Sequence, residues 1–301
     1  GTGTNRTGNT KRPDSGTPIR RNEPQSGTLP EQRPSKTVPG RKEQGERLSV
    51  TRVQKPEVDN SQNIGYDEYI PEILVEGAKD HPTKLVESSA MASVSLPETD
   101  YIPNLPKKTV ESGAVSKAQL EDVILAGNAH QQMLPNGERR GFFLGAGTGY
   151  GKGRTIASII LDNWNKGNKK AVWISKNDKA HRDSPEYWQQ VGGSEKAVFS
   201  HKNARNSINK DEGILLMTYG TLRSGYNINE NYAENPNFWT DQHENRIQQI
   251  AQWLGKDFDG VIVFDESHEM GNAVPMRGTR GTKKPSAQAL AGVMLQRLLP
   301  N

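Results

Sequence analysis

The sequence contains no cysteine, and no apolar run in it approaches the roughly 18 residues that a membrane-spanning helix requires. The missing cysteines exclude disulfides, cysteine-ligated zinc sites and thiol nucleophiles. The chain opens on a polar stretch that lacks the features of a secretory signal peptide. These absences predict a cytoplasmic protein with no membrane partner.

Aromatic residues are also scarce, and none occurs in the first 60 positions. These positions are rich in Gly, Pro, Ser and Thr, and they hold 12 basic and 7 acidic side chains. Such a composition buries too little apolar surface to offset the entropy that is lost on ordering. We therefore predict a disordered basic linker over residues 1–65. Contact between its basic side chains and nucleic acid is an alternative role.

Residues 66–113 regain aromatic and aliphatic side chains, which are spaced by prolines at positions 71, 82, 97, 103 and 106. Proline interrupts helices and favours extended backbone in the residue before it. This segment therefore predicts an extended arm that lies against a folded domain and has few helices of its own.

From residue 114 onward, short apolar runs alternate with stretches of helical periodicity. One helix is predicted from Ser116, which begins a Ser-x-x-Gln capping sequence that ends at Gln119, to about His130. The other predicted elements are strands at 141–145, 171–175, 213–218 and 260–265, and helices at 155–164, 241–254 and 286–299. Apolar strands that alternate with helices predict an α/β fold with a mainly parallel sheet covered on both faces.

The stretch GAGTGYGKGRT, residues 145–155, places five glycines and one lysine between a predicted strand and a predicted helix. There, the N–H groups of a tight loop and of a helix N-terminus converge on an anion, and glycines let the backbone approach phosphate oxygens. Lys152 would bring a positive charge to the β- and γ-phosphates. The loop departs from the usual pattern at Gly153, where Ser or Thr is expected. We interpret it as a nucleotide site; a flexible surface loop is the alternative.

A second signal follows the apolar run near residue 260, in the stretch FDGVIVFDESHEMGN. Asp265 at the end of a buried strand would hold the water shell of Mg²⁺, and Glu266 would orient and deprotonate the attacking water. A solvated acidic turn is the alternative. With the upstream loop, this pair predicts ATP and Mg²⁺ as ligands. Thr155 is a candidate for the displaced hydroxyl beside Mg²⁺, although a threonine on the helix surface is an equal alternative.

Two short motifs resemble those of superfamily 2 helicases: AGTGYGK at 146–152 and DESH at 265–268. Longer stretches resemble the strawberry-notch family of helicase-like ATPases, which carry Gly-Lys-Gly-Arg-Thr in place of Gly-Lys-Ser/Thr. These stretches are residues 81–106, 119–160, 258–272 and 285–301, in the family's order. The resemblance covers about residues 66–301 and implies a RecA-like P-loop NTPase lobe over 114–301. It makes the missing hydroxyl a family trait.

The resemblance also implies roles for individual residues. The residues expected to bind ATP are Gly147, Thr148, Gly149, Gly151, Lys152, Gly153, Arg154, Thr155 and Gln119. Gln119 resembles the glutamine that reads the adenine edge, and a solvent-facing glutamine is its alternative. The expected catalytic residues are Glu266, Asp265 and Lys152, with Mg²⁺ held by Asp265 and Thr155.

Further roles depend on segments outside the loop. The resemblance implies that His268 couples the ATP site to a second lobe. It implies that Lys176, Asn177 and His181 contact nucleic acid, and a solvated loop is the alternative for them. In the family, the last segment leads into a strand with a Ser-Ala-Thr motif and a second RecA-like lobe, and the sequence stops before both. Large bacterial and phage members often carry a DNA methyltransferase domain upstream, which would suit the linker and a bacterial or phage-infected cell.

Two functions of different classes follow from this resemblance. The first is an ATP-driven motor that translocates along or remodels duplex DNA and needs both lobes. The second is a nucleotide-dependent scaffold or transcription co-regulator, as animal members of the family are described. A small-molecule P-loop kinase is disfavoured, because the glutamate next to Asp265 suits water activation better than transfer to a substrate.

Overall fold

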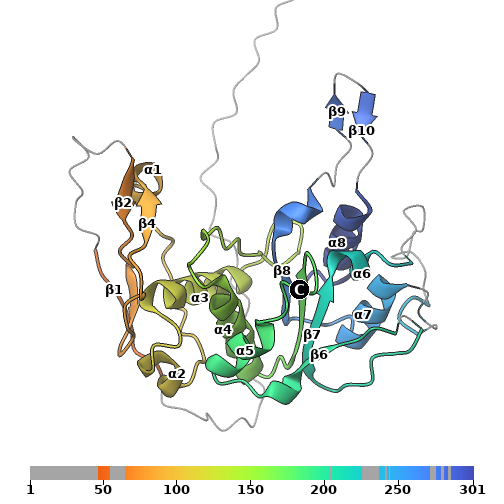
Figure 1. Ribbon diagram of the computed structural model, residues 1–301, viewed down its shortest axis with the longest axis horizontal. Helices are drawn as coiled ribbons and strands as arrows, with labels where there is room; N and C mark the ends of the chain where they lie inside the picture. The colour runs from red at the N-terminus through yellow and green to blue at the C-terminus, as the bar shows by residue number, and fades with distance from the viewer. Residues whose placement is uncertain are drawn as a thin grey trace, which may run out of the picture.

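A sheet of four parallel strands, in the order β6-β7-β5-β8, forms the centre of the computed structural model (Figure 1). The structure describes residues 47–54, 65–203, 205–225, 237–240, 243, 245–271, 276–278, 281–283 and 286–301. The strands of the sheet are β5 (Lys170–Ser175), β6 (Val198–Ser200), β7 (Gly213–Thr218) and β8 (Val261–Phe264). The predicted strands 171–175, 213–218 and 260–265 are confirmed, whereas β6 was not predicted.

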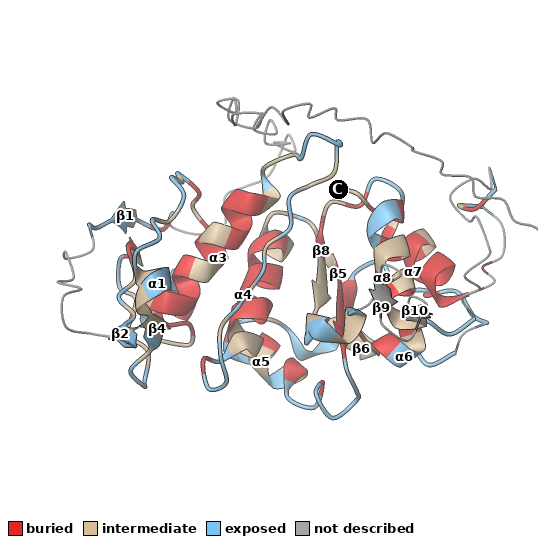
Figure 2. Cartoon of the chain, turned by 90° about the horizontal axis from the view of Figure 1, so that it is seen from above, coloured by how far each residue is buried: buried red, intermediate tan, exposed pale blue. Residues whose placement is uncertain are grey.

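Helices cover both faces of this sheet (Figures 1 and 2). Alternate strand residues point to opposite faces, so Trp173 and Leu216 join one buried cluster while Val172 and Leu215 join another. The first cluster is completed by α3 (Lys117–His130), α4 (Lys152–Asn165) and α5 (Ser184–Gln190). The second is completed by α6 (Tyr219–Leu222), α7 (Arg246–Leu254) and α8 (Ala287–Leu298). The predicted RecA-like α/β architecture is confirmed.

The helix predictions are confirmed with shifted ends. Ser116 and Gln119 form the predicted capping box at the start of α3. Helix α4 begins at Lys152 rather than at 155, and α7 begins at Arg246 rather than at 241. No helix in the described part of the chain is long and apolar enough to cross a membrane.

An N-terminal arm built of short elements packs against α3. Its elements are β1 (Val50–Arg52), β2 (Tyr66–Glu68), β3 (Ile73–Val75), β4 (Val86–Ser88), α1 (Ser89–Ala92) and α2 (Lys107–Glu111). Strand β1 pairs antiparallel with β3, and β2 pairs with β4. The carboxylate of Glu121 in α3 accepts hydrogen bonds from the backbone N–H groups of Glu72, at 2.7 Å, and Ile73, at 2.9 Å. A buried side chain of the lobe therefore holds the arm.

Strand β1 departs from the prediction of a linker over residues 1–65. Its β-branched residues suit a strand, and β3 supplies a neighbour for its backbone hydrogen bonds. Leu48, just before β1, is 6% exposed and joins the core cluster of α3 and α4. The other described residue of that range is Gly65, and the prediction for the rest of the linker lies outside the described residues.

Residues 141–145, predicted as a buried strand, form no strand in the structure, and Phe143 is 79% exposed. The physical reason is the lack of a neighbour. Strand β8 pairs with β5, and a groove runs along its other side, with Phe142 and Leu144 among the residues that line it. An apolar run becomes a strand only where an adjacent strand accepts its hydrogen bonds, and none does so here among the described residues.

The remaining elements lie outside the sheet. They are the 3₁₀ helices η1 (Glu195–Ala197) and η3 (Ser267–Met270), and the hairpin strands β9 (Met276–Gly278) and β10 (Gly281–Lys283). The hairpin follows β8 and η3 along the chain and stands clear of the sheet (Figure 1). Only Asp265 and Glu266 separate the end of β8 from the start of η3.

Candidate functional site

The glycine-rich loop ends at the N-terminus of α4. Gly149 has a φ of +87° and Gly151, the N-cap of α4, has a φ of +80°. Residues other than glycine adopt this left-handed backbone conformation at a cost of roughly 1 kcal/mol. A Cβ added at Gly147 or Gly149 would meet no atom within 4 Å, and Thr148 between them is exposed. The tip of the loop is therefore open to an approaching anion.

Lys152 is the first residue of α4 and folds back over the loop. Its Nζ donates hydrogen bonds to the carbonyl oxygens of Ala146, at 3.0 Å, and Gly147, at 3.3 Å. Both acceptors are neutral, whereas the oxygens of a phosphate are charged and accept stronger hydrogen bonds. The ammonium group is thus held next to the open tip and would gain by turning toward a phosphate.

The acidic pair follows β8. The backbone N–H of Asp265 donates to the carbonyl of Ile174 at 2.8 Å, which extends the pairing of β8 with β5 by one residue. Ser175 Oγ donates to the Asp265 carboxylate at 3.4 Å, and the hydroxyl of Tyr219 donates to the Asp265 carbonyl at 2.9 Å. The carboxylate of Asp265 is therefore fixed at the carboxyl edge of the sheet.

Glu266 has a strained backbone. Its φ of +53° makes it the one non-glycine residue with positive φ in the described part of the chain. Strain of this kind persists where the surroundings impose it, and it concentrates at functional sites. Glu266 lies at the sharp turn between β8 and η3.

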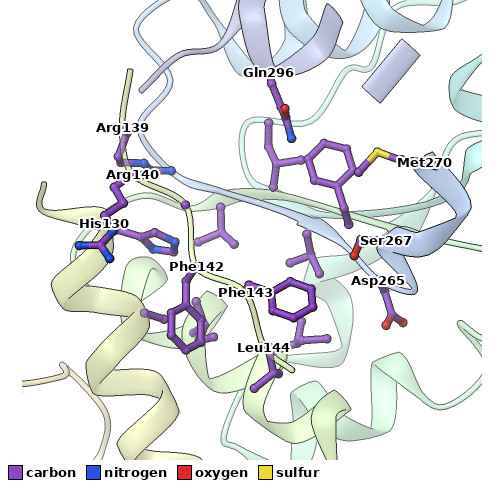
Figure 3. A pocket seen from close by; sticks show the side chains of 18 of the residues that line it. His130, Arg139, Arg140, Phe142, Phe143, Leu144, Asp265, Ser267, Met270 and Gln296 are labelled. Carbon is purple, nitrogen blue, oxygen red and sulfur yellow. The ribbon is translucent and has the colours of Figure 1, made fainter. Parts of the chain in front are cut away.

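A groove of about 700 Å³ joins the loop to the acidic pair (Figure 3). Ala146 and Lys152 line it from the loop side, and Asp265, Glu266 and His268 line it from the β8 side. Figure 3 shows Phe142, Phe143 and Leu144 along the loop side of the groove, with Asp265, Ser267 and Met270 across from them. The structure therefore brings the three predicted catalytic residues to one groove.

The turn after Glu266 carries a small network of charges. Lys176 Nζ lies 2.6 Å from a carboxylate oxygen of Glu269, and this hydrogen bond raises the pKa of Lys176 and lowers that of Glu269. His268 lies 3.3 Å from Glu266 and 3.6 Å from Glu269. His181, by contrast, is 7% exposed, its Nε2 donates a hydrogen bond to the Met217 carbonyl at 2.7 Å, and burial lowers its pKa. The structure therefore leaves Lys176 and Asn177 exposed and buries His181.

Gln119 is 3% exposed, so the solvent-facing alternative is excluded. Its Oε1 accepts from the Ser116 N–H at 2.9 Å, and its Nε2 donates to the carbonyls of Tyr150, at 3.0 Å, and Gly151, at 3.1 Å. Both ends of the amide therefore hold backbone of the site in place. Adenine contact by Gln119 stays a prediction.

Gly153 and Arg154 face α5. A Cβ added at Gly153 would overlap the ring of Tyr187, and Arg154 Nε donates to Gln190 Oε1 at 2.8 Å. The close approach of α4 and α5 therefore explains why glycine stands where other phosphate loops carry Ser or Thr.

Thr155 is fully buried, and its hydroxyl has no hydrogen-bond partner among the described residues. It does not line the groove, so its role beside Mg²⁺ stays a prediction. No group of three or more His, Asp or Glu in the described part of the chain could hold a metal ion by itself. Mg²⁺ fits the site in another way, since it commonly keeps several waters and binds one or two carboxylates together with substrate phosphates. Of the two predicted metal ligands, Asp265 lines the groove and could hold the ion there.

Two residues that no sequence motif marked also contact the loop. Asp122 of α3 accepts a hydrogen bond from the hydroxyl of Tyr150, and His81 of the arm lies 3.2 Å from the Tyr150 carbonyl. The spacing of Asp122 and Gln119, three residues apart on one helix, was the available signal, because such residues share a helix face.

Comparison with known proteins agrees with this geometry. The family model described as P-loop containing NTP hydrolase pore-1 matches residues 80–301. Protein strawberry notch from Drosophila melanogaster is 36% identical over 242 residues, which are 78% of this chain and 14% of that protein. Protein strawberry notch homolog 1 from Gallus gallus is 35% identical over 242 residues, which are 78% of this chain and 18% of that protein. Protein FORGETTER 1 from Arabidopsis thaliana is 34% identical over 210 residues, which are 67% of this chain and 15% of that protein.

The chain spans less than a fifth of the length of these relatives. No solved structure matches it. The family model covers most of the chain, including the glycine loop, Lys152 and the acidic pair. The chain therefore belongs to the P-loop NTP hydrolase pore-1 family and carries a helicase-like domain of the strawberry-notch type.

Proposed function

We propose that this domain binds ATP with Mg²⁺, hydrolyses it, and uses the energy to translocate along or remodel nucleic acid, with duplex DNA as the expected partner. The observation that carries the proposal is the groove that joins Lys152, at the N-terminus of α4, to Asp265 and Glu266, at the end of β8. The family assignment supports nucleotide hydrolysis in general.

Lys152 and the loop bind the phosphates. The open backbone around Gly147 and Gly149 offers N–H groups to phosphate oxygens. Lys152 exchanges its two carbonyl contacts for charged oxygens of the β- and γ-phosphates, which strengthens its hydrogen bonds. Its positive charge then offsets the negative charge of the transferred phosphoryl group.

Asp265 and Glu266 have separate roles, in holding the metal and in activating water. A bound Mg²⁺ would supply positive charge that offsets the negative charge of the phosphates. Asp265, fixed through Ser175 and Tyr219, is the carboxylate that holds the ion or its waters. Glu266 orients the attacking water and accepts its proton, and general base catalysis of this kind contributes roughly 10²–10⁴-fold in rate.

The distribution of charge supports nucleic acid as the partner. The whole chain has 39 basic and 35 acidic residues, and residues 1–60 hold 12 and 7 of them. Residues 270–301 hold 5 basic residues and no acidic one, which leaves 22 basic and 28 acidic residues in 61–269. The body of the domain is thus acidic, and the positive charge lies at its two ends. Basic segments of this kind bind phosphate backbones by releasing counterions.

We expect this chain alone to hydrolyse ATP weakly, because hydrolysis is expected to need both lobes. Single-turnover hydrolysis of ATP by a longer protein that contains this domain, unaltered and with Glu266→Gln, therefore tests the assignment. We expect the substitution to keep ATP affinity and to lower the rate by about 10²–10⁴-fold. Equal rates would contradict the role of Glu266.

Repeating the assay with duplex DNA separates the two functional classes, most informatively in a longer protein that contains this domain. Stimulation by DNA supports the motor. ATP binding with hydrolysis that DNA leaves unchanged supports the alternative, a nucleotide-dependent scaffold or transcription co-regulator.

A further inference from the structure

The backbone just before α4 is fastened to two other parts of the molecule. The carbonyl oxygen of Tyr150 accepts a hydrogen bond from Gln119 Nε2 of α3 at 3.0 Å, and it lies 3.2 Å from Nε2 of His81 in the arm. The carbonyl of Gly151 accepts a second hydrogen bond from Gln119, at 3.1 Å. The arm and α3 therefore meet at one peptide of the phosphate loop.

The side chain of Tyr150 is anchored as well. It is 9% exposed, and its hydroxyl donates to the carboxylate of Asp122, one turn along α3 from Gln119. Its ring stacks on the imidazole of His81, with 5.9 Å between the ring centroids and 8° between the planes. Gln119 and Asp122 thus hold the backbone and the side chain of the same residue.

This anchoring acts where the chain has the most conformational freedom. Tyr150 stands between Gly149 and Gly151, two glycines in the left-handed region. Glycine loses more conformational entropy on ordering than any other residue, so an unrestrained loop would lose it when phosphate binds. A loop that is already held in one conformation binds with a smaller entropic cost.

We propose that Asp122 and His81 are positioning residues for nucleotide binding, and that both act through Tyr150 by holding the phosphate loop in its binding conformation. This inference rests on the proposed function. It makes the N-terminal arm part of the nucleotide site, because His81 belongs to the arm and reaches the loop from outside the lobe.

The hydrogen bond between Tyr69 and Glu121 provides an internal comparison. Tyr69 donates its hydroxyl to Glu121, the residue next to Asp122 in α3, and that pair faces β3 of the arm instead of the loop. Both pairs join a tyrosine to a carboxylate of the same helix. Removing the hydroxyl of Tyr150 or of Tyr69 costs one similar hydrogen bond. A difference in ATP affinity between these two variants therefore reflects a change in the phosphate loop and not a general loss of stability.

Titration of a fluorescent ATP analogue with Mg²⁺ into the full chain tests the proposal. We expect Tyr150→Phe and Asp122→Ala each to raise Kd by at least about 10-fold, the effect of losing one hydrogen bond to a charged group. The double variant should bind no more weakly than the weaker single variant, because the two changes remove one interaction. Asp122→Asn, which keeps an acceptor oxygen, should recover most of the affinity. His81→Ala should also weaken binding, and Tyr69→Phe should leave Kd unchanged.

Thermal unfolding of each variant, followed by circular dichroism, shows that it is folded at the temperature of the titration. Unchanged Kd for Tyr150→Phe and Asp122→Ala would overturn the proposal, as would independent, additive losses. An equal loss in Tyr69→Phe would show a general effect of stability and would also overturn it. Lys152→Ala separates this failure from failure of the proposed function. If the unaltered chain binds ATP and Lys152→Ala binds it at least ~10-fold more weakly, the nucleotide site stands and the positioning inference fails alone. If the unaltered chain does not bind ATP, both fail.

Discussion

The ring of Tyr187 in α5 lies against the backbone of Gly153 in α4, with no space between them for a side chain at position 153. The usual hydroxyl of a phosphate loop is therefore excluded here by packing. Helices approach closely where one of them carries glycine, and this contact places α5 directly beside the loop.

Placing serine, the usual residue of a phosphate loop, at position 153 should therefore destabilise the fold. We expect Gly153→Ser to lower the free energy of unfolding by about 1–3 kcal/mol, the cost of forcing extra atoms into a packed site. Urea denaturation measures this. Gly147→Ser is the control, because a Cβ there would meet no atom within 4 Å, and it should change stability little. Equal effects of the two substitutions would contradict the explanation, whereas Tyr187→Ala in the Gly153→Ser background should restore part of the loss.

Thr155→Val should have opposite effects on stability and on metal-dependent binding. The buried hydroxyl has no partner among the described residues, so its removal should raise the free energy of unfolding without nucleotide by about 1 kcal/mol. If Thr155 supplies the oxygen beside Mg²⁺, the same change should weaken binding of Mg·ATP but not of ATP alone. Thr109→Val is the control for stability, since that buried hydroxyl donates to the Val191 carbonyl at 2.8 Å and its loss should destabilise. If Thr155→Val changes ATP affinity equally with and without Mg²⁺, or in neither case, the metal is held through Asp265 and water alone.

Glu121→Ala should loosen the arm. The substitution leaves the buried N–H groups of Glu72 and Ile73 without their acceptor, at a cost of roughly 1–3 kcal/mol for each group. We expect a loss of about 2–5 kcal/mol in the free energy of unfolding and faster hydrogen exchange in β3. Glu195→Ala, at an exposed position, should change stability by less than ~0.5 kcal/mol. An unchanged exchange rate in β3 would show that another contact holds the arm.

Asp122 should make stability depend on pH. Burial raises its pKa to about 7, although the hydrogen bond from Tyr150 opposes the shift and the neighbouring Glu121 adds to it. A carboxyl with a pKa above its unfolded value stabilises the fold in its protonated form. That contribution is complete below about pH 4 and is lost as the pH rises through about 7. Compared with Asp122→Asn, the unaltered chain should lose at most about 2 kcal/mol between pH 5 and 8, because the group is partly exposed to solvent. Denaturation curves of both proteins that stay parallel across this range would contradict the shift.

Most of the sheet and its helices could be predicted from the sequence, because their apolar residues follow the period of the element they form. Strand 213–218 is an uninterrupted apolar run and is β7 in the structure. Residues 141–145 have the same character and are not a strand, because a strand also requires a neighbour, which periodicity cannot reveal. The local apolar pattern thus determines whether a segment can form a strand, and the presence of a neighbouring strand determines whether it does.

The candidate site divides in the same way. Lys152, Asp265 and Glu266 stand in motifs whose spacing reflects their chemistry, and they line one groove. His81 reaches the loop only through tertiary contacts, and the one sequence signal for Asp122 is that it shares a helix face with Gln119, three residues earlier. Gln119 was marked as an adenine contact, yet its amide holds the helix cap and the loop, contacts that depend on the packing of α3 against Tyr150.

Equilibrium binding of Mg·ATP by the unaltered chain and by Lys152→Ala tests the nucleotide site most directly. The substitution removes the positive charge beside the loop tip, together with two hydrogen bonds to loop carbonyls. We expect the unaltered chain to bind a fluorescent ATP analogue and Lys152→Ala to bind it at least ~10-fold more weakly, with an unchanged circular dichroism spectrum. Equal affinity of the two proteins would contradict the assignment of this groove as a nucleotide site.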